Sequence, residues 1–218
     1  MSASLARPLD LRLPPYMLKG MNEHRQQTRT TQAAEGLPRW RWTTAEIEEL
    51  AQAGVFDEHD RFELIGGEIV PMSPKGSRHE ILRSGLAHRL SRLCPPDVWV
   101  TSEPQFNLDA DLYTVPDILV HPAEILVPDV RGPTALLVIE IADSSLSYDL
   151  RIKAPLYAAA GVREYWVIDA VKLTTTVHRD PNGSGYRSRR DIAADQVLTP
   201  AATTASALTV RLSELPLG

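Results

Sequence analysis

Two apolar segments of strand length each contain a single carboxylate, and these two acids are the residues best placed to do chemistry. Asp117 opens the sequence D-I-L-V, and Glu140 stands inside the apolar run 136–141. Burying a carboxylate among β-branched residues is costly unless a cation compensates it. A helix expected after the second segment would place Asp149 and Lys153 on one face, because their spacing is i, i+4. Acids and a lysine that meet at the end of a small sheet could hold Mg²⁺ and a water beside a phosphate.

The chemistry that this pattern favours is metal-assisted hydrolysis. Hard oxygen ligands with open water positions suit Mg²⁺ or Mn²⁺. Lys153 could lower the net charge of such a site and hold the attacking water. The same residues fit a buried Glu140–Lys153 ion pair without catalysis about equally well. The spacing alone therefore leaves both interpretations open.

Other catalytic patterns are missing from the sequence. The turn 183–185 lacks the Lys and Ser/Thr of a phosphate-binding loop. There is no Gly-x-Ser-x-Gly elbow of a serine hydrolase, and the six histidines lack metalloprotease spacing. Cys94 is the single cysteine, which excludes an intramolecular disulfide and a Cys-cluster zinc site. We expect Cys94 to be an inert structural thiol, and we expect no organic cofactor.

The composition is that of a globular protein with a real core. The chain has 218 residues, of which 43% are apolar and 23% charged. No run approaches the roughly 18 apolar residues of a membrane helix. The N-terminus lacks a compact apolar signal region, so a reducing cytoplasm is the expected compartment and no membrane partner is expected. A net charge of −5 argues against a protein that coats nucleic acid by bulk electrostatics, although it permits a local basic patch.

The order of elements predicts one folded domain. Segment 1–37, mildly basic and interrupted by proline and glycine, is predicted to be a flexible or loosely docked extension, and 38–218 to form the domain. Successive strands, a helix and a further strand predict a mixed α/β (α+β) sheet flanked by helices. The predicted helices are 43–54 with a Thr43–Glu46 capping box, 78–93, and 148–160 with a possible kink at Pro155. The predicted strands are 61–65 and 68–72 in a hairpin around Gly66-Gly67, 98–101, 105–108, 116–121, 136–141, 164–169, an edge hairpin of 173–178 and 185–189, and a closing strand at 208–212.

Several other polar residues have two interpretations each. Glu63 lies on the face of its strand opposite Phe62 and Leu64, where it is either exposed to solvent or part of the site, with even odds. His79 points inward at the start of its helix, where a histidine is usually structural but could have an accessory role in the site. Arg78, Arg89 and Arg92 fall on one side of the same helix. A solvated edge is favoured there over a ridge that contacts phosphates.

Three motifs occur in a fixed order along the chain. They are D-R-F-E-L-I-G-G-E-I-V-P-M-S-P-K-G-S-R-H, then P-D-I-L-V, then V-I-E-I-A-D-S-S-L-S-Y-D-L-R-I-K-A-P-L-Y-A-A-A-G-V-R-E-Y-W-V-I-D. In this order they resemble the Uma-type restriction endonuclease family, within the PD-(D/E)XK nuclease superfamily. The resemblance is continuous from about Trp42 to Asp169 and looser through the C-terminal strands, and it leaves 1–37 outside.

The resemblance implies a restriction-endonuclease-like core with a metal held by Asp117 and Glu140. The lysine that the superfamily carries two residues after the second acid is absent, because position 142 is alanine. Within this family the lysine corresponds to Lys153 on the following helix. Glu63 and His79 match motif positions and are further catalytic candidates.

The resemblance also implies an activity and an assembly. It implies a Mg²⁺- or Mn²⁺-dependent deoxyribonuclease that leaves a 5′-phosphate and works as a homodimer on DNA. The alternative is a non-catalytic nucleic-acid-binding or regulatory protein that retains the nuclease fold.

Overall fold

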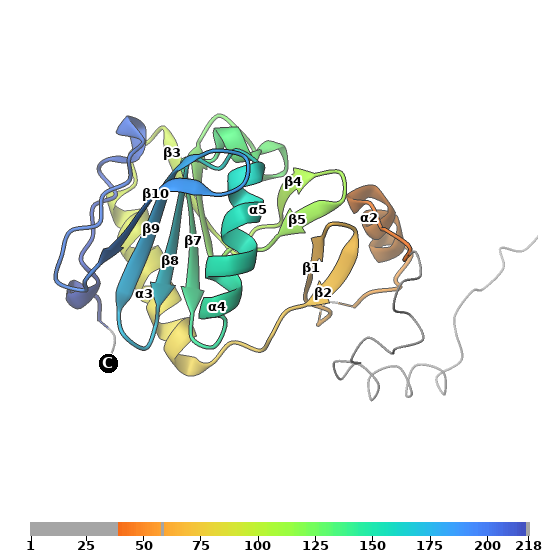
Figure 1. Ribbon diagram of the computed structural model, residues 1–218, viewed down its shortest axis with the longest axis horizontal. Coiled ribbons are helices and arrows are strands. Elements are labelled where there is room, and N and C mark those ends of the chain that lie inside the picture. Colours follow the sequence, from red (N-terminus) through yellow and green to blue (C-terminus); the bar gives the residue numbers. More distant parts are fainter. Residues whose placement is uncertain (1–38, 58, 217–218) are drawn as a thin grey trace, which may run out of the picture. The chain divides into compact units, whose positions relative to one another are not determined.

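The computed structural model describes residues 39–57 and 59–216, and the predicted extension 1–37 lies outside these residues. The described part contains a six-stranded sheet and a four-stranded sheet together with a small number of helices (Figure 1). The predicted α+β class with a mixed sheet is therefore confirmed. No helix in the described part is long and apolar enough to span a membrane.

The six-stranded sheet has the strand order β10-β9-β8-β7-β6-β3. All neighbouring strands run antiparallel except β7 and β8, which are parallel. A parallel pair requires a crossover, and here a helical segment between β7 and β8 supplies it. The bounds are Val98–Ser102 for β3, Ile118–Pro122 for β6, Leu137–Ala142 for β7, Glu164–Asp169 for β8, Thr174–Pro181 for β9 and Tyr186–Ile192 for β10.

Apolar side chains cover both faces of this sheet, as the continuous apolar runs of its central strands predict. The core on one face joins α3 (Ser77–Leu93) to β6 and β7 and includes Leu82, Leu86, Leu90, Ile118 and Ile139. The core on the other face joins the crossover helix to the same strands and includes Leu119, Val138, Ala154 and Tyr157. Figure 1 shows the crossover helix in front of the sheet and α3 behind it. The central strands are therefore fixed from both sides.

The crossover helix contains one widened turn. α4 (Leu146–Tyr148) passes into a π-helical turn, Asp149–Lys153, and then into α5 (Ala154–Ala159). The amide of Ala154 donates to the carbonyl of Asp149, five residues earlier. Pro155 has no amide hydrogen with which to continue an α-helical ladder, which accounts for a widened turn at this point. The predicted helix is present, but it begins earlier, at Leu146. The π-helical turn interrupts it just before Pro155, where a kink was predicted.

The four-stranded sheet has the order β2-β1-β5-β4, and α2 packs against it through Ile47. Its first hairpin turns at Gly66 and Gly67, whose φ angles of 57° and 79° suit glycine. This hairpin and the Thr43–Glu46 capping box of α2 are as predicted, whereas β5 was not predicted. The bounds are Thr44–Gln52 for α2, Phe62–Ile65 for β1, Glu68–Pro71 for β2, Phe106–Asp109 for β4 and Leu112–Thr114 for β5.

The predicted closing strand at 208–212 is wrong. Val210 forms only an isolated bridge with Leu198, through two hydrogen bonds of 2.8 and 3.0 Å. Leu208, Val210 and Leu212 alternate inward because they pack into the core beside α3. The alternating pattern therefore arises from a segment that covers the core, without pairing to a sheet.

Candidate active site

Asp117 and Glu140 lie opposite each other at the junction of β6 and β7. These strands pair antiparallel with Ile118 opposite Ile139, and one further step of this register places Asp117 opposite Glu140. The amide of Ile141 donates to Asp117 Oδ2 at 2.7 Å, which ties the side chain to the neighbouring strand. Both acids are buried, with 3% and 5% of their surface exposed. The structure brings together the two acids that the sequence predicted as a pair.

A cavity of about 360 Å³ opens beside these acids. Its walls come from segments far apart in the sequence, namely β2, the loop before α3, the end of β7 and the crossover helix. The charged and imidazole side chains along it are Glu63, Lys75, His79, Asp117, Glu140, Asp143, Asp149 and Lys153. All five predicted catalytic candidates are therefore in this lining.

Glu140 has one engaged carboxylate oxygen and one open one. Its Oε1 accepts hydrogen bonds from Lys153 Nζ and from the Tyr157 hydroxyl, both at 2.9 Å. Among the described residues, no donor reaches Glu140 Oε2. Burial raises the pKa of Glu140 to about 8, although Lys153 offsets part of this effect. A further cation at Oε2 would favour the charged form, so Glu140 is suited to bind one.

Lys153 bridges two carboxylates from different sheets. Its Nζ donates to Glu63 Oε1 at 2.8 Å and to Glu140 Oε1 at 2.9 Å. Burial alone would lower the pKa of Lys153, but Glu140, Glu63 and Asp149 outweigh burial and raise this pKa. Lys153 is therefore a stable cation at the centre of the site.

Glu63 belongs to this cavity, which decides between its two predicted environments. It lies on β1, where it is 3% exposed. Its Oε1 accepts from Lys153 and also from the amide of Val115 at 2.9 Å. The backbone contact fixes the direction of the carboxylate, and the carboxylate in turn fixes the lysine.

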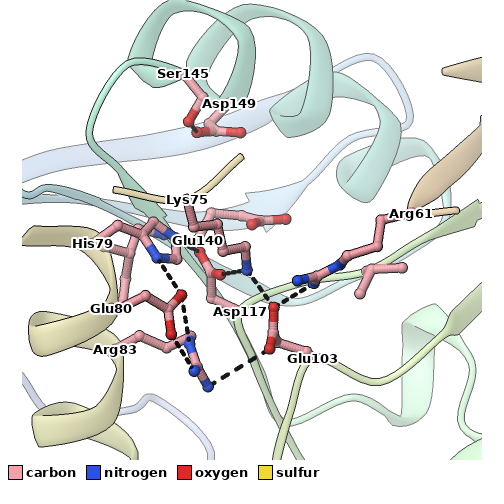
Figure 2. A network of polar contacts seen from close by, with 12 residues as sticks. Arg61, Lys75, His79, Glu80, Arg83, Glu103, Asp117, Glu140, Ser145 and Asp149 are labelled. Carbon is pink, nitrogen blue, oxygen red and sulfur yellow. Dashed lines mark hydrogen bonds and ion pairs between the residues drawn. The ribbon is translucent and has the colours of Figure 1, made fainter. Parts of the chain in front are cut away.

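His79 and Lys75 both contact Asp117 (Figure 2). His79 Nε2 lies 3.0 Å from Asp117 Oδ2, and its Nδ1 lies 3.2 Å from Glu80 Oε1. Lys75 Nζ donates to Asp117 Oδ1 at 2.6 Å. Burial on its own would raise the pKa of Asp117, but His79 and Lys75 reverse this effect and lower it. Asp117 is thus maintained as a carboxylate.

Glu103, just after β3, lies near three basic side chains close to Asp117. Its carboxylate lies 2.5 Å from Lys75 Nζ, 2.5 Å from an Arg61 nitrogen and 3.8 Å from an Arg83 nitrogen. Burial opposes the charge, but Lys75 and Arg61 lower the pKa of Glu103 to about 2. Glu103 is therefore a permanent anion that competes with Asp117 for Lys75.

Four polar residues of the site were not among the predicted catalytic candidates. Tyr157 and Asp149 lie on the crossover helix, four residues after and before Lys153. The i, i+4 spacing had placed Asp149 on one face with Lys153, and the same spacing could have suggested Tyr157. Asp149 accepts from the Ser145 hydroxyl at 2.6 Å, and burial raises the pKa of Asp149. The other two, Lys75 and Glu103, lie between secondary-structure elements and leave no periodic signal in the sequence.

The remaining sequence predictions concern residues outside the cavity. Arg78, Arg89 and Arg92 are all exposed on α3, as expected of a solvated edge, and Arg78 pairs with Asp143 at 2.8 Å. Cys94 donates from Sγ to the carbonyl of Val98 at 2.9 Å, and burial raises the pKa of the Cys94 thiol. A raised pKa disfavours the reactive thiolate, as predicted for a structural cysteine.

The donor set at this site suits a hard divalent cation. Within residues 39–57 and 59–216, no group of three or more His, Cys, Asp or Glu side chains is arranged to hold a metal. Mg²⁺ commonly binds through one or two carboxylates and keeps several waters, and Mn²⁺ accepts the same ligands. Asp117 and Glu140, with Glu140 Oε2 open, fit this requirement. On Asp117, by contrast, Lys75 already donates to Oδ1.

The mixed sheet thus carries two opposed acids and a lysine from the crossover helix beside one cavity. The chain belongs to the Uma2 family, described as "Putative restriction endonuclease", whose model matches residues 44–213. The family resemblance inferred from the sequence is thereby confirmed. A solved structure of a "putative nuclease belonging to DUF820" from Anabaena variabilis ATCC 29413 is similar, with a TM-score of 0.62 and 20% identity. The match covers 78% of this chain and 95% of that one. Comparison with curated proteins finds no match.

Proposed function

We propose that the protein is a Mg²⁺- or Mn²⁺-dependent endonuclease that hydrolyses phosphodiester bonds in DNA. The observation that carries the proposal is the opposed pair of Asp117 and Glu140, with a lysine cation beside them and one Glu140 oxygen open, in a single cavity. Membership of a restriction endonuclease family supports the reaction class.

Asp117 and Glu140 would hold the ion, which when bound would polarise the phosphate and lower the pKa of a water molecule. Asp117 is ready for this role because Lys75 and His79 keep its pKa low. Glu140 contributes its unengaged oxygen, while its other oxygen keeps Lys153 in place.

Lys153 acts as a fixed cation and not as a base. The neighbouring carboxylates raise the pKa of Lys153, so its ammonium stays protonated near neutral pH. It can donate a hydrogen bond to the attacking water and balance the negative charge that develops around phosphorus. Glu63 is a positioning residue, because it contacts Lys153 and is itself held by a backbone amide.

The proposed hydrolysis has a defined outcome. The water loses a proton as its oxygen bonds to phosphorus, the bond between phosphorus and the 3′ oxygen breaks, and the leaving 3′ oxygen takes up a proton. The products are a 5′-phosphate and a 3′-hydroxyl. A homodimer, which the family resemblance implies, would let two such sites address the two strands of a duplex.

A second candidate is a nucleic-acid-binding or regulatory protein that retains the fold without turnover. It is favoured by one observation: Lys75 and Lys153 already pair with the two acids, as they would in a purely structural network. A rise in melting temperature with Mg²⁺ that disappears in Asp117→Asn supports a metal site. The absence of any rise supports the second candidate.

The proposal is tested by incubating the full chain with supercoiled and single-stranded DNA in Mg²⁺ or Mn²⁺. We expect metal-dependent nicking that falls by about 10³-fold in Asp117→Ala and in Glu140→Ala. Glu48→Ala, which removes an exposed acid from α2, is the matched control and should nick like the unaltered protein. DNA left intact under both metals, or nicking that survives Asp117→Ala, would overturn the proposal.

A further inference from the structure

Lys75 occupies the oxygen of Asp117 that a metal would need. It lies in the loop between β2 and α3, and its side chain is 14% exposed. Its Nζ is 2.6 Å from Asp117 Oδ1 and 2.5 Å from Glu103 Oε1, so one ammonium bridges two carboxylates. Figure 2 shows this ammonium between Asp117 and Glu103.

The other oxygen of Asp117 already has two protein partners. Oδ2 contacts His79 Nε2 at 3.0 Å and accepts from the amide of Ile141 at 2.7 Å. Oδ1 has Lys75 as its only partner among the described residues. An incoming cation therefore meets Lys75 at the one oxygen of Asp117 that a side-chain movement can release. Two cations at one buried oxygen repel each other strongly, since the surroundings screen charge poorly.

Glu103 offers Lys75 a second position when Asp117 is taken. Arg61 and Arg83 hold the Glu103 carboxylate from other directions, at 2.5 and 3.8 Å. Lys75 is already bonded to this carboxylate, so it can give up Asp117 without losing an anionic partner. Glu103 thus lowers the cost of releasing Asp117.

We propose that Lys75 is an internal counter-ion for Asp117, and that a divalent metal takes Asp117 Oδ1 only when Lys75 moves to Glu103 alone. This inference rests on the proposed function in one respect, the presence of a metal at Asp117. Lys75 stabilises the metal-free protein by neutralising a buried carboxylate, and for the same reason it weakens metal binding. By linkage, the Lys75–Asp117 contact weakens metal binding by the same free energy by which bound metal weakens that contact.

The test is calorimetric titration of Mn²⁺ into the full chain after removal of metal with a chelator. Lys75→Met should bind Mn²⁺ about tenfold more tightly than the unaltered protein, a size typical of coupling between two sites. Arg61→Met is the matched control, because it removes a cation from the same Glu103 oxygen without releasing Asp117. Its affinity should stay within about threefold. In the absence of metal, Lys75→Met should melt at a lower temperature, and Mn²⁺ should raise that temperature more than it does in the unaltered protein.

Glu103→Gln gives an effect of opposite sign and does not depend on the folding of Lys75→Met. Lys75 then has no second carboxylate to move to, so Mn²⁺ affinity should fall. In the double variant Lys75→Met, Glu103→Gln this loss should disappear, as a double-mutant cycle requires when the two residues act together.

The outcomes separate this inference from the proposed function. Equal affinities for Lys75→Met and the unaltered protein, or an equal gain in Arg61→Met, would overturn the counter-ion role while leaving the metal site in place. A Glu103→Gln effect that persists without Lys75 would also overturn it. If Asp117→Asn binds Mn²⁺ as well as the unaltered protein, or if no form binds it, the metal site itself fails and the proposed function fails with it.

Discussion

Glu140 and Glu164 are buried glutamates on neighbouring parallel strands, and their surroundings differ. Glu164, the first residue of β8, is 1% exposed. Its Oε1 accepts from Trp166 Nε1 at 2.7 Å and from Nε and Nη2 of Arg179 at 2.9 and 2.7 Å. Its Oε2 accepts from the amide of Ala201 at 2.5 Å. Glu140 has donors on one oxygen only and lines the cavity.

The difference lies in how completely the protein compensates each buried charge. Both oxygens of Glu164 have protein donors, so it acts as a structural ion pair that holds β8, β9 and the C-terminal segment together. The charge of Glu140 is only partly compensated, and burial accordingly raises its pKa to about 8. A buried acid near a basic residue is therefore not enough to indicate a site; an unfilled oxygen beside a cavity is the informative feature.

The same substitution at both positions should give the largest contrast in stability. Glu164→Gln loses the charge opposite Arg179 and places an amide where the Ala201 amide donates, so the free energy of unfolding should fall by about 2–4 kcal/mol. Glu140→Gln keeps an acceptor for Lys153 and Tyr157 and removes an undercompensated charge, so its change should stay within about 1 kcal/mol. Urea unfolding in the presence of a chelator measures both. Similar losses at the two positions would show that Glu140 is as much a structural ion pair as Glu164.

Conservative substitutions of Lys153 and Arg179, the cations paired with Glu140 and Glu164, separate an effect on catalysis from an effect on stability. Lys153→Arg keeps the charge between Glu63 and Glu140 but replaces a compact ammonium with a planar fork, so DNA nicking should fall by about 10–100-fold. Arg179→Lys loses the paired contact with Glu164 and should lower the free energy of unfolding by about 1 kcal/mol without changing nicking by the folded protein. Nicking rates at equal folded concentration and urea curves provide the two measurements. If Lys153→Arg nicks as fast as the unaltered protein, Lys153 serves only as an ion-pair partner.

The contrast between these regions also explains what the sequence could reveal. Asp117, Glu140 and Lys153 stand in segments with strong local patterns, two apolar strands and a helix, so they could be found before the structure was known. The hairpin at Gly66-Gly67 was predictable for the same reason, because its turn chemistry is local. Pairing between these segments then follows from a single sheet register.

Features that depend on long-range contacts were missed or left undecided. Lys75 reaches Glu103 across 28 positions and Asp117 across 42, from a loop without periodicity. From the sequence, Glu63 had even odds of being exposed to solvent or part of the site. Alternation along β1 assigns its side chain to a face but does not tell which element covers that face. The segment 208–212 was misassigned, because an alternating pattern is the same for a strand and for a segment that only covers the core.

The smallest effect concerns a buried histidine on the opposite face of the sheet from the Glu164 pair. His178 precedes Arg179 on β9, is 5% exposed and stacks on Tyr165 with ring centroids 5.5 Å apart. Burial, followed by the charge of Arg189, lowers the pKa of His178 from its ordinary value of 6.5. The histidine of the unfolded chain therefore becomes protonated near pH 6.5, whereas that of the folded protein becomes protonated only at a lower pH. Stability should fall as the pH drops below about 6.5, and a single proton limits the slope to about 1.4 kcal/mol per pH unit.

His178→Phe keeps the stacked ring and removes the titration, so its stability should depend less on pH than that of the unaltered protein. Urea unfolding between pH 7.5 and 5.5, with chelator present, measures the difference, and His88→Gln on the exposed face of α3 is the control that should change nothing. Curves that run parallel for the unaltered protein and His178→Phe would mean that folding leaves the pKa of His178 unchanged.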